Sequence, residues 1–165
     1  MKISAFFLLI ILSSCTTTKV YLVRHAEKAG NAPTDGLKIP EGVARRDALG
    51  LYLNHYQFAG VYSTNYPRTI QTIKPLADLQ GIPLVIYNNG DSLLSVLIAE
   101  KNRRFVIVGH SNTIPQMIRA NGLNPGFSGN IPDNEFDNLY IITVKQKNGS
   151  PVKKSQKKKY GAATP

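Results

Sequence analysis

Two histidines, each placed directly after a short apolar run, are the residues of this chain best suited to chemistry. The pair Arg24-His25 follows the run 19–23, and His110 follows the run 105–108 after a single glycine. Both runs are typical of buried strands, and in an open α/β sheet ligands bind at the carboxyl ends of the strands. Two histidines and an arginine brought to that edge predict a site for an anion and a nucleophile.

A third polar segment is expected at the same edge of the sheet. Ser63 follows the expected strand 59–62, and Arg68 comes soon afterwards, where Pro67 suits the first turn of a helix. Arg24 and Arg68 can each bind two oxygens of a phosphate group through a planar pair of donors. Phosphate esters are therefore the class of anion that these residues fit.

The chemistry that this combination favours is phosphoryl transfer through a phosphohistidine. The charge of Arg24 should lower the pKa of His25 and leave one of its ring nitrogens unprotonated as a nucleophile. His110 can donate to the equatorial oxygens of the transferring group, and Ser111, with the backbone amides that open the next helix, suits an anion as well. Taken singly, Arg24 could be a surface charge and His25 a satisfied polar residue, but the combination favours catalysis.

The elements that must position these residues alternate along the chain. Strands are expected at Val20–Val23, Ala59–Tyr62, Pro83–Tyr87, Arg104–Val108 and Leu139–Val144, and helices at Glu41–His55, Pro67–Leu79, Ser92–Lys101 and Pro115–Ala120. Such alternation predicts an α/β fold, a three-layer α/β/α sandwich with a mostly parallel central sheet. The loops 29–40 and 121–134 are long and rich in glycine, proline and asparagine, which is typical of functional lids.

The first residues read as a targeting segment rather than as part of the fold. Lys2 precedes an apolar run from Ala5 to Leu12, which is too short to span a bilayer, and two serines then lead to Cys15. Leu12 to Cys15 resembles the lipobox of bacterial lipoproteins, in which the cysteine is lipidated and begins the mature chain. We therefore expect a signal peptide over 1–14 and a lipid anchor at Cys15, on the periplasmic side of a bacterial membrane; the alternative is an ordinary signal peptide with a chance cysteine.

The positive charge of the chain is concentrated at its other end. The net charge is +10, but residues 145–165 hold seven lysines and no acid, whereas residues 16–144 hold 12 basic and 10 acidic residues. We expect a domain over 15–145 followed by a basic, disordered tail over 146–165. No stacking aromatics are interleaved with these lysines, so no nucleic-acid partner is expected, and contact with anionic lipid headgroups is the better interpretation.

Three blocks of the sequence resemble the histidine phosphatase superfamily, also called phosphoglycerate mutase-like. The segment 22–27 (LVRHAE) is similar to the Arg-His-Gly signature, with alanine in place of glycine, and the segments 62–72 and 108–111 are similar to its second and third blocks. The resemblance implies that His25 is phosphorylated and that Arg24, Arg68 and His110 bind the phosphoryl group. It implies no organic cofactor and no metal, and with only three histidines a metal site has little support from the residues themselves.

The general acid for the leaving group is the part of the pattern that the sequence leaves open. One branch of the superfamily carries an aspartate directly after the second histidine, where this chain has Ser111. In the other branch the acid follows the third strand, which favours Asp91, although Asp91 could equally cap the next helix. Asp133 and Glu135, in the second long loop, could fold over the site instead.

The function predicted from these residues is a metal-independent phosphatase of the cell envelope. Its partners would be a small phosphorylated substrate or a phosphoprotein, and the membrane through Cys15. A phosphoglycerate mutase is the first alternative, which the export signal and the short middle region oppose. The second alternative is a catalytically idle lipoprotein that binds an anion. If no acid reaches the site, substrates with good leaving groups should be favoured, and short phosphatases that act on protein phosphohistidine are of that kind.

Overall fold

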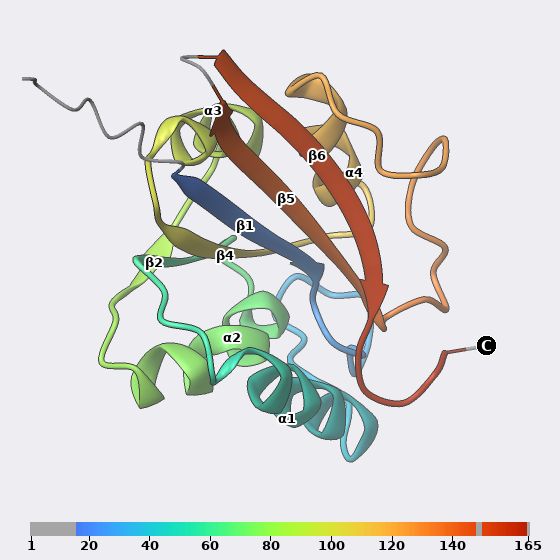
Figure 1. Cartoon of the computed structure of the whole chain (residues 1–165). Coiled ribbons are helices and arrows are strands. Elements are labelled where there is room, and N and C mark those ends of the chain that lie inside the picture. Colours follow the sequence, from blue (N-terminus) through green and yellow to red (C-terminus); the bar gives the residue numbers. More distant parts are fainter. Residues whose placement is uncertain (1–15, 148–149, 165) are drawn as a thin grey trace, which may run out of the picture.

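The computed structural model describes residues 16–147 and 150–164, arranged as one sheet with helices on both of its faces (Figure 1). The predicted signal peptide and Cys15 lie outside the described residues, so the structure does not test them. Within the described part of the chain, no helix has the length and apolar character that crossing a bilayer requires.

Ten elements make up the fold. The strands are β1 (Thr17–Arg24), β2 (Gly60–Ser63), β3 (Leu84–Ile86), β4 (Arg104–Gly109), β5 (Asn138–Lys147) and β6 (Ser150–Lys159), and the helices are α1 (Glu41–Leu53), α2 (Pro67–Leu79), α3 (Gly90–Ala99) and α4 (Thr113–Ala120). All nine elements predicted from the sequence are present, most with ends shifted by a few residues. Pro75 lies inside α2 without ending the helix.

The sheet has the order β3-β2-β4-β1-β5-β6, in which the first four strands are parallel and the last two are antiparallel to their neighbours. The expected three-layer sandwich with a mostly parallel sheet is therefore confirmed. In the register of β1 with β4, Arg24 pairs with Gly109. Both catalytic candidates that follow these strands thus leave the sheet at the same level.

Each face of the sheet is covered by one pair of helices, as Figure 1 shows. Leu94 of α3 and Met117 of α4 pack with the residues of β1, β4 and β5 that point to one face. Leu49 of α1 and Ile73 of α2 pack with the residues that point to the other. Because β1 is buried on both faces, it is held in a fixed position and can present the residues that follow it with little freedom.

The expectation of a disordered tail is wrong for most of that segment. Residues 150–159 form β6, which pairs with β5 along its whole length at the edge of the sheet. The lysine-rich composition predicts disorder because it offers little apolar surface, but a complete ladder of backbone hydrogen bonds with β5 does not depend on composition. Ion pairs of Lys157 and Lys159 with Glu135 and Asp137 add to that ladder.

The residues that follow β6 are also held against the domain. The buried guanidinium of Arg45 in α1 donates to the carbonyl oxygens of Tyr160 and Ala162 and forms an ion pair with Glu27, with 2.7 Å between Nη2 and Oε1. Thr164 in turn bonds to Asp137. The described C-terminal residues are therefore part of the folded domain, which extends beyond the predicted boundary at residue 145.

Candidate active site

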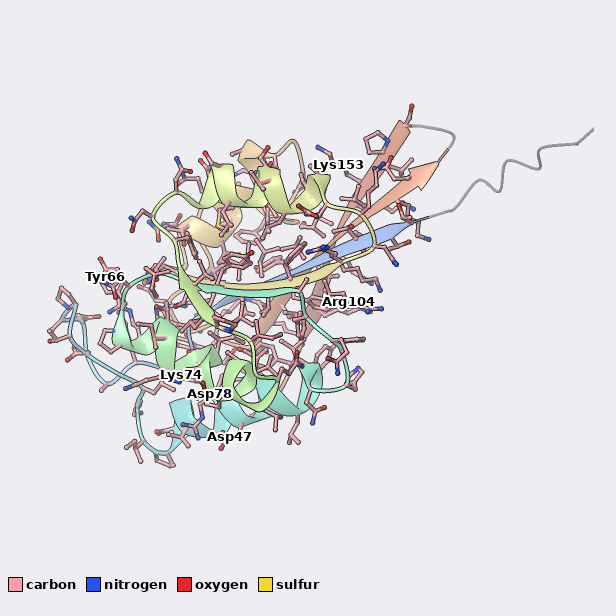
Figure 2. All side chains as sticks on the ribbon, turned by 90° about the vertical axis from the view of Figure 1, so that its left-hand side faces the viewer. Asp47, Tyr66, Lys74, Asp78, Arg104 and Lys153 are labelled. Carbon is pink, nitrogen blue, oxygen red and sulfur yellow. The ribbon has the colours of Figure 1, made fainter. Side chains whose placement is uncertain are left out.

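A polar cavity of about 430 Å³ lies at the carboxyl edge of the parallel strands. It is lined by Arg24, His25, Lys28, Thr64, Tyr66, Arg68, His110, Ser111, Asn112, Thr113 and Asp133. The structure therefore brings together His25, Arg24, Arg68, His110 and Ser111 as the sequence predicted. Figure 2 shows Tyr66 at this edge and Arg104 at the opposite end of the sheet.

The glycine before His110 allows that histidine to leave the sheet beside His25. A Cβ atom on Gly109 would lie only 2.8 Å from Oγ1 of Thr113 and 2.9 Å from the hydroxyl of Tyr87, which is closer than real Cβ contacts. The carbonyl oxygen of Gly109 accepts the backbone N–H of His25 at 2.9 Å. As a result the two imidazole rings lie with their centroids 5.5 Å apart.

The ring of His25 is fixed in one tautomer. Its Nδ1 lies 2.7 Å from the carbonyl oxygen of Ala26, which can only accept, so Nδ1 carries the proton and Nε2 carries the free electron pair. The backbone N–H of Ala26 donates to Oγ1 of Thr72 in α2, which ties this residue to the helix. Burial lowers the pKa of His25 to about 3, with Arg24, His110 and Arg68 adding to the effect. The predicted direction is confirmed, but burial contributes more than the arginines do.

His110 is held by a chain of hydroxyl groups. The hydroxyl of Thr64 donates to Thr69 Oγ1, which donates to backbone carbonyls, so Nε2 of His110 is the donor in its 2.9 Å bond to Thr64 Oγ1. Burial, together with Arg68 and Arg24, lowers the pKa of His110 to about 4. At neutral pH His110 is thus an uncharged donor at the cavity.

The two arginines are held in different ways. Nη1 of the buried Arg24 donates to the carbonyl oxygens of residues 132, 133 and 135, and the ring of Phe136 packs on its guanidinium at 4.1 Å. Arg68 stacks on the ring of Tyr66 at 4.5 Å and is half-buried. In both side chains the buried Nε has no partner among the described residues. The cavity therefore holds two guanidinium groups with donors left over for an anion.

The structure does not place Asp91 among the residues that line the cavity, in contrast to its expected position. Its carboxylate accepts from Gln116 of α4 at 3.1 Å, and it does not cap α3 either, because Asn89 accepts the backbone N–H of Ser92. Glu135 points away from the cavity, towards Asn138 and the lysines of β6. Asp133 is the one acid among the lining residues, fully exposed and 3.6 Å from Nη2 of Arg24.

Comparison with known proteins agrees with this geometry. Residues 20–89 match the Histidine phosphatase superfamily (branch 1), a stretch that contains Arg24, His25 and Arg68. Over this stretch the chain is similar to the histidine phosphatase superfamily. No curated protein matches the chain. The match covers less than half of the chain and ends before His110, which the structure nevertheless places beside His25.

Solved structures with the same fold include several that are described as phosphatases. The protein histidine phosphatase SixA complexed with tungstate is 16% identical, with a TM-score of 0.59, over 86% of this chain and 96% of that one. A SixA homologue described as a phosphohistidine phosphatase from Agrobacterium tumefaciens is 20% identical, with a TM-score of 0.55, over 87% and 97%. A mycobacterial glucosyl-3-phosphoglycerate phosphatase is 12% identical, with a TM-score of 0.60, over 89% and 100%. At these identities the likeness shows the fold, and with the family match it confirms the expectation of a histidine-type phosphatase.

Several residues of this candidate site were not singled out by the sequence. Lys28, Tyr66 and Thr64 line the cavity, and Thr72 orients the backbone beside His25. Thr64, in the loop after β2, and Thr72, in α2, both lie inside the block that resembles the superfamily. That block could have pointed to them, but a threonine in a loop or a helix has many ordinary explanations. Among the residues that the structure describes, no group of three or more potential metal ligands occurs.

The buried histidines predict that stability falls as the pH is lowered. In the unfolded chain they titrate near about 6.5, whereas the folded pKa values are about 3 for His25 and about 4 for His110. Between these values the unfolded state binds more protons, so the stabilisation is complete above about pH 6.5 and is lost as the pH falls towards the folded values. The slope approaches about 1.4 kcal/mol per pH unit for each histidine.

Urea unfolding at a series of pH values between 7 and about 4 measures this slope. His25→Asn should remove part of it, whereas the variant His55→Asn, at an exposed position far from the cavity, should retain it. An unfolding free energy that stays constant over this range in the unmodified chain would contradict the buried, neutral state of the two histidines.

Proposed function

We propose that this chain is a phosphatase that transfers the phosphoryl group of its substrate to Nε2 of His25 and then to water. The observation that carries the proposal is the fixed tautomer of His25, whose Nδ1 donates to Ala26 and whose Nε2 is left unprotonated beside two arginines. A neutral imidazole with a free electron pair is the state that a nucleophile needs at neutral pH. An idle anion-binding protein has no need of it.

The mechanism has two displacement steps. In the first, a bond forms between Nε2 of His25 and phosphorus, and the bond from phosphorus to the leaving group breaks. Arg24 and Arg68 neutralise the charge on the equatorial oxygens, and Nε2–H of His110, which Thr64 holds at the cavity, donates to one of them. In the second step water attacks phosphorus, the bond to His25 breaks, and inorganic phosphate leaves with the electron pair returned to Nε2.

The substrate class follows from the absence of a buried acid at the cavity. Of the described residues that line it, Asp133 alone is acidic, and its side chain is fully exposed and faces Arg24. A leaving group that departs without a strong acid, such as the imidazole of a phosphohistidine or an aryl oxide, suits this arrangement. The neighbours described as SixA are phosphohistidine phosphatases, and we propose a protein phosphohistidine as the substrate here as well.

Phosphate release from an aryl phosphate and from a histidine-phosphorylated protein, measured with chelator present, tests the proposal. Release that resists the chelator is expected, because protein side chains supply both the nucleophile and the charge neutralisation. Exchange of phosphate between positions of one phosphoglycerate without release would indicate a mutase instead. Tight binding of phosphate or vanadate without turnover would indicate an anion-binding protein.

We also propose that the phosphatase is held at the cell envelope through Cys15. The support is the sequence alone, an apolar run followed by the lipobox-like segment, since these residues lie outside the described structure. Cys15→Ser should remove the lipid and shift the protein from the membrane fraction to the soluble fraction. Metabolic labelling with a fatty acid measures the loss of the lipid, and separation of the membrane and soluble fractions measures the shift in location. Unchanged labelling in the variant would contradict a lipid on Cys15.

A further inference from the structure

The lysines of β6 point alternately to the two sides of the sheet and have different surroundings on each side. Residues 153, 157 and 159 pair with residues of β5 that face α3 and α4, and residues 154 and 158 pair with residues that face α1 and α2. Figure 2 shows Lys153 on the α3 side of the sheet and Arg104 on the α1 side. A segment that reads as one uniform basic run is thus divided into two surfaces.

Acidic residues pair with lysines of β6 only on the side that faces α3 and α4, where Lys153 alone forms no ion pair within the described residues. Lys157 and Lys159 form ion pairs with Glu135 and Asp137, and Lys157 also lies 5.5 Å above the ring of Phe127. These lysines hold β6 to the loop before β5. Their role is structural, and their charge is largely compensated.

The other side carries charges without acidic partners. Arg104, Lys19, Thr143 and Lys154 lie next to one another across β4, β1, β5 and β6 in register. The unpaired cations on this side are Lys19, Arg104, Lys145, Lys154 and Lys158, which we call the basic face. Within the described residues none of the five forms an ion pair, and all except the half-buried Lys19 are exposed.

We infer that the basic face is a docking surface for anionic lipid headgroups. An extended row of cations on the face of a sheet presents charge in the same plane, as a membrane surface does. Val152, which pairs with Lys145 at the end of this face, is 44% exposed and offers an apolar contact beside the charges. Thr17 also pairs with Lys145, so the strand that follows the proposed lipid site at Cys15 begins at this same end.

This placement leaves the cavity open. Arg24 and His25 follow the far end of β1, about 23 Å from Thr17 at the usual rise of a strand. Lys158 lies near that far end, because it pairs with Leu139, which pairs with Val23, whereas Lys19, Lys145 and Lys154 lie nearer Thr17. A molecule held at the membrane through these three lysines therefore presents the phosphatase site away from the lipid. The inference builds on the proposed envelope location, but it is tested separately from the lipid anchor and from catalysis.

Two double variants of the full chain test the inference, because they remove equal charge from opposite sides of the same strand. Lys154→Gln with Lys158→Gln alters the basic face, and Lys153→Gln with Lys157→Gln is the matched control. Binding is measured to phosphatidylcholine vesicles with and without phosphatidylglycerol. The ratio of the two affinities isolates the contribution of charge, since any binding through the segment before β1 is the same for both kinds of vesicle.

For the unmodified chain, the affinity for vesicles with phosphatidylglycerol should be well above the affinity for vesicles without it. The basic-face variant should lower this ratio roughly thirty-fold, and the control variant should change it little. Salt that shortens the Debye length to about 3 Å should bring every ratio close to one. The inference would be overturned if the two double variants lost affinity for the charged vesicles equally, or if the unmodified chain bound both kinds of vesicle equally well. It would also be overturned if the basic face were needed for binding an oligonucleotide but not for binding vesicles. Both variants should retain the aryl phosphatase activity of the unmodified chain, and an absence of that activity in all three would contradict the proposed function without affecting the vesicle result.

Discussion

Replacement of His25 by alanine should reduce phosphate release at least about a thousandfold, because it removes the group that forms the covalent intermediate. No other described residue offers an unprotonated ring nitrogen in the same place, since Nε2 of His110 is a donor in its bond to Thr64. The measurement is single-turnover release of phosphate from an aryl phosphate. In the unmodified chain, a phosphorylated protein that is labile to acid and stable to alkali should form before release and should be absent from His25→Ala.

Loss of activity must be separated from loss of folding, because His25 is buried. His25→Asn keeps more of the side-chain volume and should be equally inactive. Both variants retain Arg24, Arg68 and His110, so both should still bind tungstate or inorganic phosphate. Activity in a folded His25→Ala protein within tenfold of the unmodified chain would exclude the phosphohistidine mechanism.

The edge of the sheet at which the site lies could be predicted from the sequence because strand patterns and strand ends are local properties. The buried runs before Arg24 and Gly109 fix where each histidine leaves the sheet, and parallel pairing then places the two at the same level. The tautomer of His25 depends instead on the carbonyl of Ala26, a residue whose backbone N–H donates to Thr72 of α2, 46 residues away. Contacts of this kind leave no periodic pattern in a sequence.

Asp91 and β6 show why some expected positions differ from the structure. Asp91 follows the correct strand, but Asn89 caps the helix two residues earlier, and the carboxylate then turns towards Gln116 on α4. The loop that does reach the cavity is held by hydrogen bonds from Arg24 to its backbone carbonyls, which are independent of side-chain identity. β6 likewise forms through backbone hydrogen bonds with β5, which any residue type can make. The lysine-rich composition of this segment therefore predicts disorder although the segment is a strand.

The unmodified phosphatase should prefer substrates with good leaving groups by a hundredfold or more. A positioned general acid contributes about 10²- to 10⁴-fold to the departure of a poor leaving group. Asp133 is not positioned in this sense, because its carboxylate is fully exposed and lies 3.6 Å from Arg24. Comparison of kcat/KM for an aryl phosphate and an alkyl phosphate measures the preference directly.

Asp133→Asn distinguishes a site without an acid from a site whose acid is recruited by the substrate. If Asp133 gives no proton, the variant retains the ratio of aryl to alkyl hydrolysis, and any change in affinity is shared by both substrates because it arises from Arg24. If Asp133 turned towards a bound substrate and protonated it, the variant would lose alkyl hydrolysis selectively. That selective loss would contradict the proposed preference for phosphohistidine, because an enzyme with a working acid has no chemical reason to be restricted to leaving groups that do not need one.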